Sequence, residues 1–246
     1  MTLFSIKNDF LDKIPLEIYS SLVIFLIILI LAIYVKIKSK KVDPLAKPKG
    51  LMLLIEMGVE YIDGLVERTA GKLLVKNLGP YIGFCCMYLF PSFIFGLFGL
   101  PSPITYYIVP LIMALFTFIL IHGTSIYYTR WKYFKRFVDP FPFFLPINLI
   151  SMWAPLISLS FRMFGNAVAG WVLMELIYSV FQILSEALFG GLFLPVAALV
   201  TPVLHAYFDL FSGFMQTTIF ITLSMLFVNS EIPDDVDVNS LPLEVK

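Results

Sequence analysis

Apolar residues occur in long runs along most of the chain, and the first run extends from Leu16 to Val35. It contains one charge, Glu17, at its start. About 20 residues at a rise of 1.5 Å each cross a hydrocarbon core of about 30 Å, so this run predicts a spanning helix. Basic residues cluster after the run and mark its cytoplasmic side, which places the amino terminus outside. They are Lys36, Lys38, Lys40, Lys41, Lys47 and Lys49.

Residues 51–76 have a different pattern, with an acidic stripe and an opposite apolar stripe at helical spacing. The acidic stripe consists of Glu56, Glu60, Asp63 and Glu67, and the apolar stripe of Ile55, Val59, Ile62 and Val66. A helix with two such faces is expected to lie along the cytoplasmic membrane surface rather than to cross it.

Two further runs, Leu78–Leu100 and Ile108–Tyr128, predict a hairpin of two spans. The link between them, Pro101–Tyr107, has no charge and suits an outer turn. The hairpin returns to a second basic cluster, so both clusters fall on the same side of the membrane. The residues of this cluster are Arg130, Lys132, Lys135 and Arg136.

The proline-rich connector Asp139–Pro146 precedes two apolar stretches at about 149–185 and 195–229. Each is longer than a perpendicular span requires, so we expect a hairpin that tilts steeply or lies nearly flat in the membrane. A turn at Gly190–Gly191 and Pro195 separates them.

The predicted fold is therefore an all-α integral membrane protein. It has one amino-terminal span, an interfacial amphipathic helix, a two-span hairpin and a long tilted or near-horizontal helix hairpin. The expected segments are 1–50 with the first span and basic linker, 51–77 interfacial, 78–137 with the two-span hairpin, 138–229 with the long hairpin, and 230–246 as an acidic, disordered tail.

Composition supports a lipid environment. Hydrophobic residues make up 59% of the chain and charged residues 14%, whereas soluble domains are about 45–50% apolar and about 25% charged. Lys+Arg and Asp+Glu are both 17, which lacks the basic excess that nucleic acid binding needs. Phosphate-binding, nucleophile-elbow and zinc-ligand motifs are absent from the sequence, so we expect no cofactor, no metal and no nucleotide hydrolysis by this chain.

Arg162 lies about ten residues inside the first long stretch. A charge at this depth costs roughly 2.5–3.5 kcal/mol and cannot be removed by deprotonation, so it must meet a carboxylate, water or both. Small residues share its helical face, which lets another helix pass at close range. They are Pro155, Ser158, Gly165, Asn166 and Ala169. A snorkelling arginine, or one paired within a helix bundle, is the alternative.

Four more ionisable residues interrupt the long stretches, namely Glu175, Glu186, His205 and Asp209. Glu175 is expected on the opposite face from Arg162, lining a separate aqueous pocket or paired within the bundle. Glu186 lies near the turn, where solvation explains it. His205 and Asp209 are one turn apart and can hydrogen-bond. With Ser212, Gly213 and Gln216 they predict a polar face that suits either a water-filled half-path or a helix–helix contact.

The segment SLSFRMFGNAVAG, with Arg162-Met163-Phe164-Gly165-Asn166 at its centre, resembles the signature of the a subunit of F-type ATP synthases. GLFGLPSPITYY, PFPFFLPINLI and FSGFMQTTIFITLSMLF resemble the same family, so the similarity covers roughly residues 78–229. The resemblance implies a stator subunit beside a ring of c subunits, with a peripheral-stalk b subunit among its partners. Two offset half-channels would carry protons or sodium ions between the ring carboxylates and opposite membrane faces.

By position, Arg162 matches the arginine between the half-channels, Ser158 and Asn166 match polar positions around it, and Gln216 matches the glutamine that faces it. Trp171 stands where many members carry Glu or His, and Glu175, one turn on, is expected to substitute. Asp209 occupies a position where other members carry His or Glu. Nucleotide chemistry would belong to partner subunits.

Two other classes of function remain open at this stage. A secondary transporter is expected to show inverted repeats around a midplane pocket, and no repeat is evident. A structural membrane anchor is expected to tolerate a neutral residue at Arg162. The expected location is the bacterial inner membrane, with the carboxyl terminus cytoplasmic, or alternatively the mitochondrial inner membrane.

Overall fold

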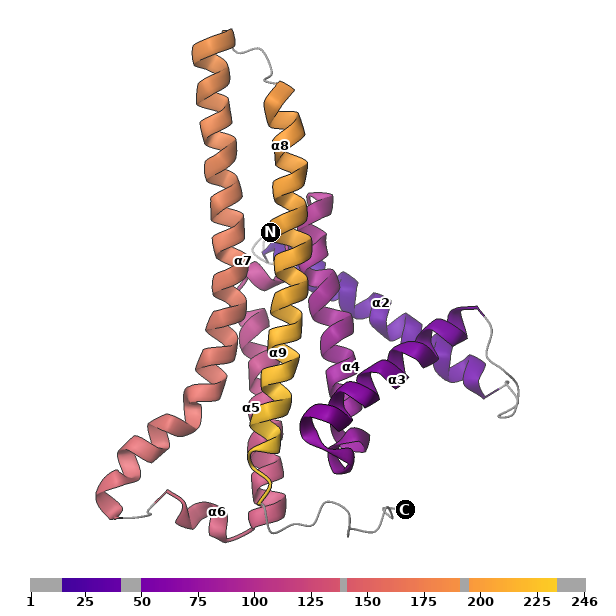
Figure 1. Ribbon diagram of the computed structural model, residues 1–246, viewed down its shortest axis with the longest axis vertical. Coiled ribbons are helices and arrows are strands. Elements are labelled where there is room, and N and C mark those ends of the chain that lie inside the picture. Colours follow the sequence, from indigo (N-terminus) through magenta and orange to yellow (C-terminus); the bar gives the residue numbers. More distant parts are fainter. Residues whose placement is uncertain (1–14, 41–49, 138–140, 191–194, 234–246) are drawn as a thin grey trace, which may run out of the picture. The chain divides into compact units, whose positions relative to one another are not determined.

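The computed structural model describes residues 15–40, 50–137, 141–190 and 195–233, and regular structure within these ranges is entirely helical (Figure 1). Five helical stretches are long and apolar enough to cross a membrane. They are Leu16–Ser39, Leu74–Phe98, Ile108–Thr129, Leu145–Ala187 and Val200–Asn229. The predicted all-helical membrane fold is thus confirmed, whereas the tilt of the last two stretches stays a prediction. The predicted disordered tail lies outside the described residues beyond position 233.

The described residues fall into two compact units. The first takes its residues from Met1–Ile33, Met87–Pro110 and Arg162–Thr217. The second takes them from Tyr34–Cys86, Leu111–Phe161 and Thr218–Lys246. Several long apolar helices, such as Leu145–Ala187, contribute residues to both units.

In the second unit, helix α3 (Leu51–Ala70) is the predicted amphipathic helix, with Val66 fully buried and Glu56 exposed. It ends earlier than the predicted range of 51–76. The reason is Gly71, whose φ of 84° lies in the left-handed region and stops the helix. Helix α4 (Lys72–Ile94) begins directly afterwards, so the second span starts before the predicted Leu78.

The structure also corrects the role of Asp63. A Cβ atom at Gly79 of α4 would lie 2.7 Å from Oδ1 of Asp63, and one at Gly83 would lie 3.6 Å from the Ile62 side chain. Asp63 therefore packs against α4 instead of belonging to an open acidic face, because the two glycines let α3 approach closely.

Hydrogen bonds between side chains connect three helices of the second unit. Oη of Tyr81 in α4 is 2.6 Å from Oγ1 of Thr117 in α5 (Ile108–Thr129). That Oγ1 is 3.3 Å from Oγ of Ser224 in α9 (Ser212–Asn229). Thr117 and Ser224 are fully buried, so these polar groups satisfy one another away from solvent. The basic loop after α5 holds the short helix α6 (Lys132–Lys135).

The first unit contains the start of α2 (Leu16–Ser39) and the end of α4, joined by a hydrogen bond of 2.6 Å between Ser21 and Tyr88. After α4 come two 3₁₀ turns, η1 (Phe95–Phe98) and η2 (Pro103–Thr105). The second of these forms the link that the sequence predicted as a turn.

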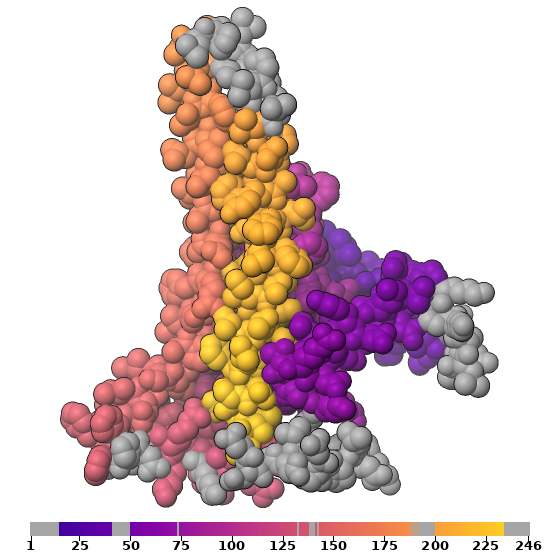
Figure 2. Space-filling view, viewed as in Figure 1, coloured from indigo at the N-terminus to yellow at the C-terminus, as the bar shows by residue number. Residues whose placement is uncertain are grey.

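Helix α7 (Leu145–Phe189) is continuous over 45 residues and follows a 3₁₀ turn, η3 (Pro142–Phe144), in the proline-rich connector. At 1.5 Å per residue its length is about 68 Å, more than twice the hydrocarbon thickness of about 30 Å. Within the first unit, α7 from Arg162 onward and α8 (Pro195–His205) lie side by side, as the orange segments of Figures 1 and 2 show. Gly190 has a φ of 60° at the end of α7, and Gly191 lies outside the described residues.

Candidate functional site

Arg162 lies in α7 with Ser158 one turn before it and Asn166 one turn after it. It is the only Lys or Arg among the described residues of the first unit. The side chain is half-buried and its Nη1 atom is fully buried. Because a guanidinium keeps its proton, α7 carries a fixed positive charge at this position.

Small residues beside Arg162 form an open face of α7. Gly165, Asn166 and Ala169 are exposed. A Cβ atom added at Gly165 would meet no atom of the described chain within 4 Å. The small-residue face predicted from helical spacing is therefore accessible to a helix of another chain.

Asn166 connects α7 to the last helix. Its Nδ2 atom donates a hydrogen bond of 2.5 Å to Oε1 of Gln216. Gln216 is 1% exposed, and its Nε2 atom is buried without a hydrogen-bond partner in the described part of the chain. The structure thus places the predicted residue Gln216 against Asn166, one helical turn from Arg162.

Three side chains form a continuous series of hydrogen bonds from α7 to α8 and the segment that follows α8. Oη of Tyr178 is 2.6 Å from Nε2 of His205, and Nδ1 of His205 is 2.7 Å from Oδ2 of Asp209. The predicted contact between His205 and Asp209 is confirmed. Both nitrogens of the His205 ring are therefore engaged, one by a hydroxyl and one by a carboxylate.

Asp209 lies within η4 (Ala206–Phe211), a stretch of π-helix between α8 and α9. A π-helical turn holds more residues than an α-helical turn, and such turns are frequent at functional sites. Of the predicted polar face, His205 and Asp209 line a cavity, whereas Gln216 makes a helix–helix contact with Asn166.

Two glycines allow the helices of this unit to approach closely. A Cβ atom at Gly96 in η1 would lie 3.1 Å from the Asp209 carboxylate, and one at Gly213 would lie 2.5 Å from the Phe93 side chain. The backbone at Gly96 therefore supports the Asp209 carboxylate directly, which limits where that carboxylate can move.

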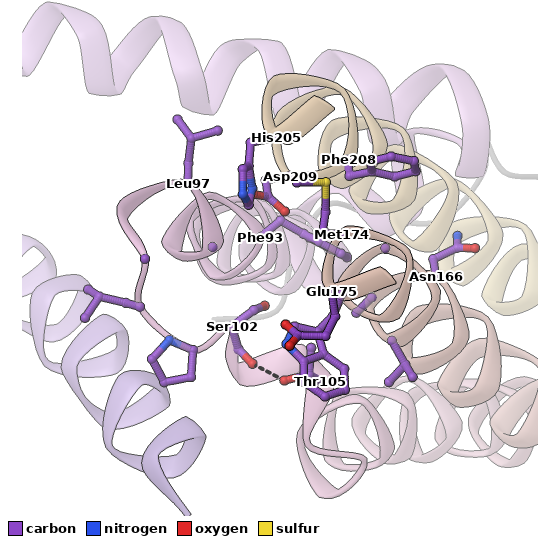
Figure 3. Close-up of a pocket in the computed structure, with 18 of the residues that line it drawn as sticks. Phe93, Leu97, Ser102, Thr105, Asn166, Met174, Glu175, His205, Phe208 and Asp209 are labelled. Carbon is purple, nitrogen blue, oxygen red and sulfur yellow. Dashed lines mark hydrogen bonds and ion pairs between the residues drawn. The ribbon is translucent and has the colours of Figure 1, made fainter. Parts of the chain in front are cut away.

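The first unit contains a half-open cavity of about 800 Å³ that His205 and Asp209 line. At about 30 Å³ per molecule of liquid water, it has room for roughly 25 waters. Figure 3 shows His205 and Asp209 next to each other, with Glu175 contributed by α7. The polar residues of the lining are Glu17, Ser102, Thr105, Asn166, Glu175, Tyr178, His205 and Asp209.

The cavity brings together some of the predicted residues and leaves out others. Glu175 and Trp171 both line it, as expected from their spacing of one turn. Arg162, Ser158 and Gln216 do not belong to the lining, which ends at Asn166. Glu186 is exposed outside the cavity and accepts a hydrogen bond of 3.2 Å from Gln182.

Two ionisable residues that line the cavity, Tyr178 and Glu17, were not predicted from the sequence. Tyr178 follows Glu175 by three positions on the same face of α7, which was an available signal. Glu17 is the one charge in the first apolar run, but nothing local connects it with residues of α7 or η4. The three carboxylates of the lining, those of Glu17, Glu175 and Asp209, thus come from three separate segments.

Comparison with known proteins gives a consistent result. The family described as ATP synthase A chain matches residues 18–229. The chain is 31% identical to ATP synthase subunit a of Mycoplasma genitalium over 223 residues, which cover 85% of this chain and 76% of that protein. It is 26% identical to ATP synthase subunit a of Pediococcus pentosaceus over 227 residues, covering 88% and 89% of the two chains.

Proposed function

Because the chain belongs to the ATP synthase A chain family, we propose that it is the stator subunit that conducts ions beside the rotor of an F-type ATP synthase. The partners are a ring of c subunits that faces Arg162, a peripheral-stalk b subunit and the other subunits of the complex. Ion translocation is the work of this chain, and nucleotide chemistry takes place on partner subunits.

The observation that carries this proposal is the relation between the cavity and Arg162. The cavity is lined by three carboxylates and ends at Asn166, which lies one helical turn after Arg162 in α7. A hydrated path of this kind delivers an ion close to Arg162 without including the arginine itself. A fixed cation at the end of a water-filled path repels other cations, which prevents a direct leak.

The open face of α7 gives the rotor a place to pass. Gly165 and Ala169 leave room for a neighbouring helix beside Arg162. A rotor carboxylate crosses lipid at least cost when it is neutral, but beside the guanidinium it is stable in its charged form. It can therefore release its ion there and take up another ion from a second path.

The charge pattern supports an outer position for the cavity. Basic residues follow α2 and α5, and such clusters mark the cytoplasmic side. The cavity is lined instead by Glu17 at the start of α2 and by residues of the uncharged link, including Ser102. We therefore assign it to the outer half-path of a bacterial inner membrane protein whose amino terminus is outside.

Glu175 and Asp209 are the ion-binding groups that we propose for this half-path. Glu175 replaces the Glu or His that many family members carry at the position of Trp171, since both residues line the same cavity. Asp209 supplies a second carboxylate close to the last helix, and Gly96 holds it in place. Ser158 and Gln216 are assigned to the surroundings of Arg162.

The test is ion flux through the assembled complex in vesicles. We expect Glu175→Gln and Asp209→Asn each to slow ATP-driven ion uptake, because each removes a titratable group from the half-path. Glu186→Gln is the matched control, since that carboxylate lies on the same helix but outside the cavity. Equal ion uptake in all three variants would show that the cavity is not part of the ion path.

A further inference from the structure

The chain Tyr178–His205–Asp209 connects the cavity water with a carboxylate that is partly buried. Tyr178 is 44% exposed, whereas the Asp209 side chain is 21% exposed. We propose that these three residues form a proton relay, with Tyr178 as its entry, and that the ion carried along this half-path is H⁺. This inference rests on the proposed function and assigns a step of the ion path to Tyr178.

The relay balances as a sequence of proton transfers. In the starting state Tyr178 donates to Nε2 of His205, and Nδ1–H of His205 donates to the Asp209 carboxylate. A hydronium ion in the cavity donates a proton to Oη of Tyr178 and leaves as water, the hydroxyl proton of Tyr178 moves to Nε2, and the proton on Nδ1 moves to Oδ2 of Asp209. Tyr178 remains neutral, His205 changes tautomer and Asp209 gains one proton, which it then passes toward the rotor. Proton exchange with cavity water, which takes one proton from Nε2 and returns one to Nδ1, restores the starting tautomer.

The surroundings of His205 fit protons better than sodium ions. Na⁺ is a hard cation that requires several oxygen ligands, whereas both ring nitrogens already hold hydrogen-bond partners. The other titratable groups that line the cavity are the Glu175 and Glu17 carboxylates, and no Lys or Arg lines it among the described residues.

Tyr178→Phe tests the entry step, because it removes one hydroxyl and keeps the ring. We expect proton uptake to fall about fivefold, less than the ~100-fold or more of a lost acid–base group, since cavity water partly replaces the hydroxyl. Tyr207→Phe is the matched control, because Tyr207 lies in η4 but not in the cavity lining. Equal uptake in Tyr178→Phe and the control would overturn the relay.

A second variant separates proton transfer from a structural contact. His205→Ala leaves space for a small base within the cavity, so added imidazole is expected to restore at least half of the proton uptake. Pyrazole has nearly the same shape but is far less basic, and it is expected to restore none. Recovery with both compounds, or with neither in a complex that still assembles, would show that His205 only fills space.

The identity of the ion gives a readout that distinguishes this inference from the proposed function. Proton uptake by the unmodified complex is expected to be the same in sodium-free medium and in medium with added sodium chloride. If ATP drives Na⁺ uptake instead, the relay is refuted and the stator role stands. If Arg162→Ala and Asp209→Asn also leave all ion movement unchanged, the proposed function fails and the relay fails with it.

Discussion

Nδ2 of Asn166 lies 2.5 Å from Oε1 of Gln216, so one hydrogen bond connects α7 with α9 a single turn beyond Arg162. Asn166 also lines the cavity, whereas Gln216 is buried behind it. This bond therefore fixes the spacing of the two helices at the point where the cavity ends and the arginine begins.

Asn166→Ala is expected to destabilise the protein by about 1–3 kcal/mol, because it leaves the buried Gln216 amide without its hydrogen-bond donor. The thermal midpoint of the purified chain in detergent measures the loss. The double variant Asn166→Ala/Gln216→Met is the control, and it is expected to lose less because both polar partners are absent. A single variant as stable as the unmodified chain would show that the bond contributes nothing.

Gly165→Leu is expected to leave the chain folded but to stop rotation. The added side chain meets no described atom within this chain, and it occupies the face along which we propose that the rotor moves. The measurement is ATP-driven ion uptake by the assembled complex, with expression level as a check on folding. Gly123→Leu in α5 is the control, because Gly123 also has open space around it. Unchanged uptake in Gly165→Leu argues that the rotor passes elsewhere.

Gly96→Ala is expected to slow ion uptake severalfold, approaching the effect of Asp209→Asn. The new Cβ atom would lie 3.1 Å from the Asp209 carboxylate, which must then move from its place beside His205. Gly123→Ala is the matched control in an open position. The account is contradicted if Gly96→Ala conducts normally while Asp209→Asn does not, because the position of Asp209 would then not matter.

In the second unit, the pairing of Glu231 with Arg136 predicts a pH dependence of stability. The two residues make hydrogen bonds of 2.7 and 3.2 Å. Burial alone would raise the pKa of Glu231, but hydrogen bonds from Arg136 and Ser125 and the positive charge of Arg136 hold it below its ordinary value of 4.5. A carboxyl with a lowered pKa contributes stability above its unfolded pKa and loses it as the pH falls through the folded pKa.

The thermal midpoint of unfolding is therefore expected to decrease as the pH is lowered from about 5 to about 3. The decrease is expected to be smaller in Glu231→Gln. Glu186→Gln controls for a carboxylate that has no cationic partner in the described structure. If the thermal midpoint depended more steeply on pH in Glu231→Gln than in the unmodified chain, the result would be the opposite of this expectation. It would contradict a lowered pKa for Glu231.

Local patterns in the sequence predicted the features that depend on local spacing. Apolar runs predicted the spans, and the spacing of four residues predicted the contact between His205 and Asp209, which the structure has at 2.7 Å. The charge of Arg162 within an apolar stretch indicated a functional position, and that role stays a prediction. These features depend only on helix geometry and on the cost of charge in lipid.

Contacts between distant segments could not be predicted in the same way. Tyr178 and His205 meet only because α7 and α8 pack in one particular register, and they are 27 positions apart. Glu17 reaches the cavity from another helix. The break at Gly71 and the π-helical turn at Asp209 depend on backbone conformations that helical periodicity does not reveal.

Arg162→Ala in the assembled, vesicle-reconstituted complex tests the central claim most directly. An imposed proton gradient should drive proton flow through this variant without ATP synthesis, because the barrier between the two paths is lost and the ring carboxylate has no cationic partner. Arg162→Lys shows whether any positive charge suffices. Normal coupling of proton flow to ATP synthesis in Arg162→Ala would contradict the account.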